Sequence, residues 1–359
     1  VSDSTNLSGY NLVGAMRSNQ STISKTGTYF TQWTLAMPGD LSFTAGLGMS
    51  NMNLELKDQL YVPANNKPDA KIPRGYQTSY LNMVSPHFAV NKVFKKMFTL
   101  YASYSKGYKA PVSSYFFIPA TGELNRGLVP ETGEQIELGT KGNLMKKRLQ
   151  YEIAVFKTVF YNKMTAVAVP LNSVTTAYSY MRNGGRQNHQ GVELLLRGTV
   201  FESAQGFFRS VKPFANFAYS DFRYGTFKFQ TLNSARTGIV ETDYSGKVVA
   251  GVSPITVNCG IDMNLFYGLY FSINYSYRDA MYFTSDNLNQ TKSFGILNSK
   301  AGIKTQIAKH FELEVFVGAN NITSTQYYQM VFVNQLPDAY IPGPREINFY
   351  AGLNLRFSF

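Results

Sequence analysis

The residues best suited to chemistry in this sequence are aromatic and arginine side chains in segments rich in Pro, Gly, Asn and Asp. A guanidinium group forms charge-assisted hydrogen bonds with anionic oxygens, and aromatic rings make ring and cation–π contacts. Together these groups suit an anionic ligand with planar rings. The candidate ligand-binding residues are Tyr115, Phe117, Arg126, Arg186, Arg236, Tyr327, Tyr328 and Arg345.

Each of these residues also has a purely structural interpretation. An aromatic side chain can pack within its own segment, and an arginine can pair with a carboxylate and stiffen the scaffold. The carboxylates available for such pairing are Glu131, Glu137, Glu193 and Glu241. The sequence leaves both interpretations open, although segments held by a rigid scaffold commonly carry binding residues.

Catalysis and metal binding have little support in the sequence. The three histidines, His87, His189 and His310, lie in separate segments, and no G-x-S-x-G element is present. Nucleophilic catalysis needs a nucleophile, a base and a third group that orients the base. We therefore predict that the protein is not an enzyme and has no intrinsic cofactor or metal.

The charge pattern argues against nucleic acid as a partner. The net charge is +12, from 34 basic and 22 acidic residues, but the basic residues are dispersed and form no stripe or basic helix. Two small clusters, Lys92-Lys95-Lys96 and Lys146-Lys147-Arg148, fall in short connections. We interpret them as solvated turn residues that anchor strand ends near lipid headgroups.

The elements that position these residues are alternating segments. Between residues 346 and 359 every odd position is apolar and every even position is polar, small or Tyr350. This period of two is typical of a strand with one apolar and one polar face. We expect the outward-facing residues to be Phe349, Leu353, Leu355 and Phe357, and the inward-facing ones Asn348, Asn354 and Arg356.

Fourteen segments of this kind follow one another along the chain. They are roughly 8–18, 25–37, 41–53, 77–90, 97–106, 134–143, 148–162, 176–199, 209–224, 248–265, 268–283, 293–307, 310–320 and 346–358. Short connections at 38–40, 91–96, 144–147, 200–208, 266–268 and 308–309 alternate with long ones at 54–76, 107–133, 163–175, 225–247, 284–292 and 321–345.

This alternation predicts an all-β fold, a transmembrane antiparallel β-barrel with about fourteen strands visible. Outer-membrane barrels have short periplasmic turns and long extracellular loops. The 25 tyrosines and 27 phenylalanines suit aromatic girdles at the membrane boundary. A soluble aromatic-rich β protein is the alternative.

Residues 101–142 contain two motifs, YASYSKGYKAP and NRGLVPETGEQIELGTKG. In this stretch the sequence resembles the TonB-dependent outer-membrane receptors, where an aromatic strand ends in Y-S-x-G-F-x-x-P and a later strand carries E-L-G-x-K. Three more resemblances follow in the same order. They are Asn183 with Gly191-Val192-Glu193-Leu194, then Gly318 to Ile322 with Tyr327-Tyr328, and finally Pro342-Gly343-Pro344-Arg345.

The resemblance implies a 22-stranded barrel with an N-terminal plug, in the outer membrane of a Gram-negative bacterium among lipid and lipopolysaccharide. It implies import of a scarce nutrient, most often a ferric siderophore, with energy from the TonB complex. Iron would arrive only as a chelated ligand. Residues 1–359 contain neither the plug nor the first strands, so we interpret them as the C-terminal portion of such a barrel.

Three alternatives remain. The chain could be a complete, passive fourteen-stranded porin-like channel, or the same type of receptor for cobalamin or for an oligosaccharide. Haem is disfavoured, because haem receptors of this family place a histidine in the loop between the first two motifs. Residues 109–130 contain none, and His310 falls in an expected periplasmic turn.

Overall fold

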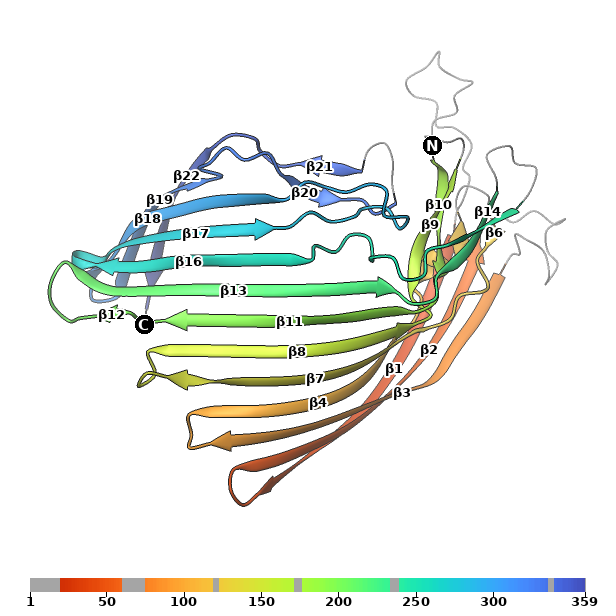
Figure 1. The fold of residues 1–359 in the computed structure, drawn as a ribbon, viewed down its shortest axis with the longest axis horizontal. Helices are drawn as coiled ribbons and strands as arrows, with labels where there is room; N and C mark the ends of the chain where they lie inside the picture. Colours follow the sequence, from red (N-terminus) through yellow and green to blue (C-terminus); the bar gives the residue numbers. More distant parts are fainter. Residues whose placement is uncertain are drawn as a thin grey trace, which may run out of the picture.

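The computed structural model describes residues 20–59, 75–118, 123–170, 176–232, 239–334 and 339–358. These residues form one large antiparallel sheet with four two-stranded hairpins beside it (Figure 1). The predicted strand at 8–18 lies outside the described residues. Within the described ranges, no helix is long and apolar enough to cross a membrane.

The large sheet has fourteen strands, and almost all are neighbours in chain order. The short β12 (Phe201–Glu202) pairs only with β13. The main path consists of β1 (Gln20–Met37), β2 (Leu41–Asp58), β3 (Gly75–Phe94), β4 (Phe98–Lys109), β7 (Glu131–Leu144), β8 (Leu149–Tyr161), β11 (Gln187–Gly198), β13 (Phe208–Tyr224), β16 (Ile255–Leu265), β17 (Leu269–Arg278), β18 (Phe294–Ala308), β19 (Phe311–Asn320) and β22 (Asn348–Phe357).

The predicted alternation of short and long connections is confirmed. The short turns gather at one end of the sheet, and the hairpins lie in the long connections towards the other end (Figure 1). These hairpins are β5 (Phe117–Ile118) with β6 (Glu123–Leu124), β9 (Met164–Pro170) with β10 (Thr176–Asn183), β14 (Lys228–Leu232) with β15 (Ile239–Asp243), and β20 (Tyr328–Val331) with β21 (Tyr340–Pro342).

The prediction of one continuous strand over 176–199 is wrong. The segment divides into β10, which pairs with β9, and β11, which pairs with β8 and β13. The break falls at Gly185, which has a φ of +90°. A Cβ there would lie 1.9 Å from the carbonyl oxygen of Thr226, so only glycine fits this sharp change of direction.

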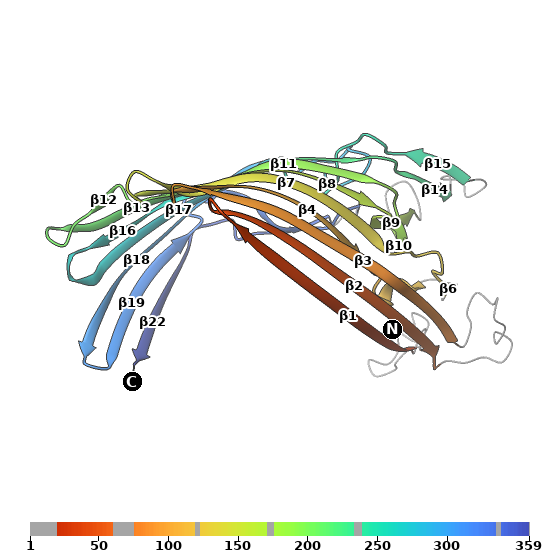
Figure 2. The same cartoon turned by 90° about the horizontal axis from the view of Figure 1, so that it is seen from below.

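The sheet curves, so that it has a convex and a concave face, and β1 and β22 are its outermost strands (Figure 2). On β22, Phe349 and Leu353 are 76% and 65% exposed on the apolar face. Asn354 points the other way and donates a hydrogen bond from Nδ2 to Oε2 of Glu314 at 3.0 Å. The predicted facing of the last strand is therefore confirmed.

Polar side chains connect neighbouring strands across the concave face. Glu314 of β19 also accepts hydrogen bonds from the Tyr270 hydroxyl and from Lys300 Nζ, the latter at 3.0 Å. Lys300 Nζ lies 3.8 Å from the ring centre of Phe316. Because these groups belong to β17, β18, β19 and β22, the network fixes the register of the C-terminal strands.

Candidate ligand-binding site

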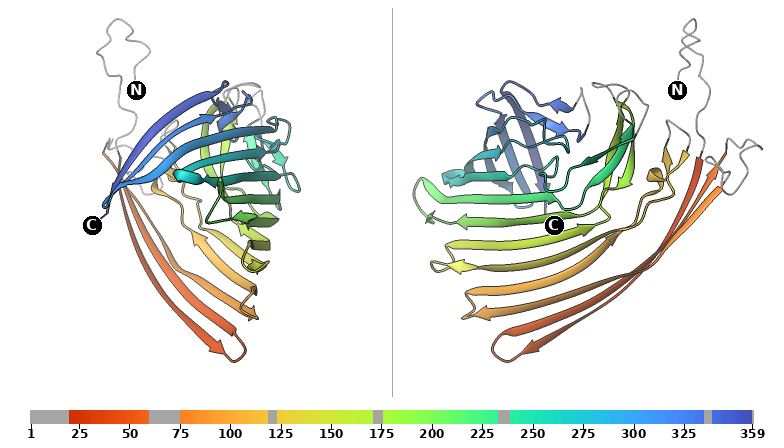
Figure 3. Two further views of the ribbon diagram at one scale, coloured as in Figure 1. Left: turned by 90° about the vertical axis from the view of Figure 1, so that its left-hand side faces the viewer. Right: turned by 45° about the vertical axis from the view of Figure 1, so that its right-hand side comes forward.

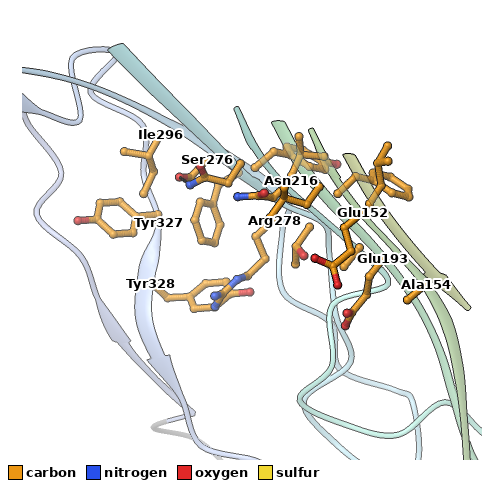
Figure 4. Close-up of a pocket in the computed structure, with 18 of the residues that line it drawn as sticks. Glu152, Ala154, Glu193, Asn216, Ser276, Arg278, Ile296, Tyr327 and Tyr328 are labelled. Carbon is orange, nitrogen blue, oxygen red and sulfur yellow. Dashed lines mark hydrogen bonds between the residues drawn. The ribbon is translucent and has the colours of Figure 1, made fainter. Parts of the chain in front are cut away.

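A pocket of about 810 Å³ lies on the concave face between the wall of the sheet and the segment that carries β20. Figure 4 shows the wall side chains of β8 to β18 directed towards Tyr327 and Tyr328, which approach from that segment. Figure 3 shows how the C-terminal strands arch towards this side of the sheet. The pocket therefore has one wall of strands and one of loop.

The period-two alternation places the wall residues on one face. Asn216 pairs in register with Asn258, which pairs with Ser276 on the next strand. One step along, Thr256 pairs with Arg278, which pairs with Phe294. Residues paired directly across an antiparallel sheet share a face, so this row of polar side chains is a consequence of strand register.

The pocket carries carboxylates at one side and a guanidinium at the other. Glu137, Glu152 and Glu193 lie on β7, β8 and β11, and Arg278 lies beside Tyr328 (Figure 4). Glu137 accepts hydrogen bonds from the Tyr101 hydroxyl at 2.9 Å and from Gln135 at 3.0 Å. Within the described part of the chain, Glu152, Glu193 and Arg278 form no ion pair.

The loop wall of the pocket is held in place by aromatic contacts and by hydrogen bonds of the Asn321 side chain. The ring of Phe294 lies 5.0 Å from that of Tyr328 and 5.7 Å from that of Tyr327. The Asn321 side chain, 1% exposed, donates to the carbonyl oxygens of Thr325 and Pro344 at 3.0 and 3.1 Å. Both ends of the segment from 321 to 347 are thus tied together.

Neighbouring long connections pack against each other above this pocket. The Tyr224 hydroxyl lies 2.9 Å from Ser285 Oγ, and Asn334 donates to the same oxygen at 3.0 Å. The rings of Tyr244 and Phe227 are tilted by 52° to each other, with 5.7 Å between ring centres. Burial, and the nearby charge of Asp286, raise the pKa of Tyr244.

A second group of connections packs around Phe116, which is fully buried with Leu54, Leu56, Leu128 and Met164. Tyr115 and Phe117 pack against this cluster, as their structural interpretation predicted. The guanidinium of Arg126 lies 5.9 Å from the ring centre of Tyr76 at the edge of the cluster.

Of the seven predicted ligand-binding residues that the structure describes, Tyr327 and Tyr328 alone line the candidate ligand-binding pocket. Arg186 donates to Asn188 Oδ1 at 3.1 Å and lies 5.6 Å from the ring centre of Tyr161, both away from the pocket. Arg345 is exposed, and Arg236 lies outside the described residues. The expected arginine partner Glu131 pairs instead with Lys109 and Lys163, at 3.9 and 3.6 Å.

Sequence analysis did not select Arg278, Glu152 or Asn216, which the structure places in the pocket. The available signal was their position on the polar side of alternating segments. Arg278 ends the run from Leu269 and is the only arginine among the residues that line this pocket.

The TonB dependent receptor-like β-barrel family model matches residues 2–322. The chain belongs to this family. No curated protein sequence is significantly similar to it. Among solved structures it is similar to the siderophore receptor PiuA from Acinetobacter baumannii, with a TM-score of 0.69 and 16% identity over 94% of this chain and 44% of that one.

Two other similar structures are the ferric yersiniabactin uptake receptor FyuA from Yersinia pestis and the copper transporter OprC. Their TM-scores are 0.61 and 0.66, at 16% and 13% identity. The alignments cover 95% and 94% of this chain but 46% and 48% of those proteins. The chain therefore spans less than half the length of these structures, and at this identity the likeness concerns the fold.

Proposed function

We propose that this protein is an outer-membrane receptor that binds a ferric siderophore on its extracellular side and imports it with energy supplied through TonB. Its family supports this role, as do the similar structures of the siderophore receptor PiuA and the ferric yersiniabactin uptake receptor FyuA. OprC, a copper transporter of similar fold, favours metal nutrients as the wider class of cargo.

The observation that carries the proposal is the pocket between the concave wall and Tyr327 and Tyr328. Two phenol rings beside the guanidinium of Arg278 suit an anionic chelate with planar rings, bound at the Arg278 side of the pocket and away from Glu137, Glu152 and Glu193. Among the described residues there is no group of His, Cys, Asp and Glu that could hold a metal ion. Iron in this account is bound by the cargo and not by the protein.

The convex face supports placement in the outer membrane. Ile136, 62% exposed on that face, is followed towards the long connections by Glu134, which pairs with Lys106 at 3.0 Å. On β13, Asp221 accepts hydrogen bonds from Gln190 and Arg223 at 3.0 and 2.8 Å. A charged band beyond an apolar surface suits lipid headgroups, so we propose lipid and lipopolysaccharide as its surroundings.

The remainder of the receptor belongs to the proposal as well. The solved structures are about twice as long as this chain, so residues 1–359 would supply the C-terminal portion of the barrel. A region outside this chain would supply the plug and the contact with TonB. The passive porin-like channel would need neither.

The test is siderophore binding by the purified full-length receptor, measured calorimetrically with catecholate, hydroxamate and carboxylate ferric chelates. We expect one class to bind and Arg278→Gln to weaken it by roughly tenfold, because a charge-assisted hydrogen bond contributes about 1.5–3 kcal/mol. Arg186→Gln, outside the pocket, is the matched control. Equal effects of both variants, or binding of no chelate, would refute the proposal.

A further inference from the structure

The basic turn between β7 and β8 lines a second pocket on the concave face. Lys147 and Arg148, interpreted from the sequence as headgroup anchors, border a space of about 450 Å³. Arg197 of β11 and Lys212 of β13 border the same space. Because Arg197 and Lys212 belong to strands of the sheet, the pocket is lined by strand residues as well as by the turn.

Strand register fixes which way these side chains face. Arg197 pairs with Phe214, and Lys212 pairs with Asp262. Both therefore share a face with Asn216, which lines this pocket and the candidate ligand-binding pocket. The second pocket is thus on the same wall as the first, displaced towards the short-turn end of the sheet.

A smaller pocket of about 240 Å³ extends the basic surface across β4 and β7. Lys96 of the turn between β3 and β4 and Lys141 of β7 line it, and Asn143 and Gln150 line both spaces. We call the two pockets together the basic basin. Its cations are Lys96, Lys141, Lys147, Arg148, Arg197 and Lys212.

Carboxylates balance the charge of the basic basin only in part, because Asp262 and Glu152 lie directly across from Lys212 and Lys141 and the other four cations have no carboxylate paired with them. The two pockets contain only Asp262 and Glu152 as acidic residues, and Asp262 accepts a hydrogen bond from Ser272 at 2.5 Å. In the part of the chain that the structure describes, none of the six cations forms an ion pair. By contrast, Lys304 on the same face pairs with Glu312 at 3.1 Å.

The turn that presents Lys147 and Arg148 has an energetically unfavourable backbone conformation. Met145, Lys146 and Lys147 have φ values of 52°, 57° and 70°, a left-handed conformation that side chains with a Cβ disfavour. Glycine or asparagine would adopt it with less strain. Lys95 and Lys96 of the neighbouring short turn have the same conformation, so this backbone geometry belongs to the tight turns that present the basic side chains.

We propose that the basic basin binds a small multivalent oxyanion through its phosphate or carboxylate groups. Several unneutralised cations in one concavity raise the local concentration of anions, and arginine binds such groups in a bidentate manner. A passing anionic cargo would meet the basin at the short-turn end of the lumen. That transport role rests on the proposed function, whereas oxyanion binding itself does not.

The experiment uses the purified full-length receptor in non-ionic detergent at low salt, with pyrophosphate and citrate as probes in calorimetry. We expect Arg197→Gln/Lys212→Gln to weaken binding by at least roughly tenfold. Lys304→Gln, whose ion pair lies outside the basin, should change it less than about twofold. Thermal unfolding of each variant verifies that it is folded.

Two results would overturn the inference. One is the absence of probe binding by the unaltered receptor, which is also the result expected if an acidic protein segment covers the basin. The other is equal binding by the double variant. A ferric chelate titrated into the same preparation separates the two proposals, since chelate binding without pyrophosphate or citrate binding would refute the basin alone.

Discussion

Leu353 and Asn354 are neighbours in β22 but face opposite sides of the sheet. Leu353→Arg should destabilise the folded barrel by about 2–4 kcal/mol if the residue lies near the bilayer midplane, because a charge on the lipid face loses hydration. Asn354→Arg places the same group on the concave face beside Glu314 and should cost much less. Urea titration of refolding into lipid vesicles measures both, and equal costs would contradict the assigned facing.

Cys259, the single cysteine of the sequence, offers a second test of facing. It pairs with Ala215 and Tyr275 on the convex face, as the alternation of its neighbours predicts. In membranes Cys259 should resist a charged maleimide, because the lipid against the convex face excludes a charged reagent. Val200 is 63% exposed in a short turn, so Val200→Cys in a Cys259→Ser background should react. Mass spectrometry of each protein measures the maleimide added. Rapid labelling of native Cys259 would place it in water.

At the scale of elements, the segment from 321 to 347 depends on the buried side chain of Asn321. Asn321→Asp would turn acceptors towards the carbonyl oxygens of Thr325 and Pro344, leaving buried groups unsatisfied. We expect faster amide hydrogen exchange over this segment, while β17 to β19 stay protected. Thr323→Ala, at an exposed position of the same segment, is the control. Unchanged exchange in the Asp variant would show that the segment is held by other contacts.

The strands were predictable because each has one apolar and one polar face. The predicted ends of the strands were wrong where the alternation continues through a turn. At 176–199, β10 and β11 both alternate but pair with different strands. The candidate site was predicted less well. Arg186 lies one residue before β11 and turns to the convex side, whereas Tyr327 and Tyr328 reach the pocket through a fold of their loop. Neither placement follows from spacing.

At the scale of the whole molecule, the concave face is divided by charge. Glu137 and Glu193 line the candidate ligand-binding pocket towards the long connections, and Arg197 and Lys212 line the basic basin towards the short turns. If both proposals hold, an anionic cargo would bind Arg278 and the tyrosines, be repelled by Glu137 and Glu193, and be attracted by the basin. Part of the +12 net charge of the chain is therefore concentrated in the basic basin.

We propose that this protein imports a ferric siderophore with energy from TonB. The most direct test is uptake of radioactive iron, supplied as the chelate that binds the purified receptor, by cells with and without the receptor and with and without TonB. We expect iron to accumulate only when both the receptor and TonB are present. Accumulation that needs the receptor but persists without TonB would contradict it and favour a passive channel.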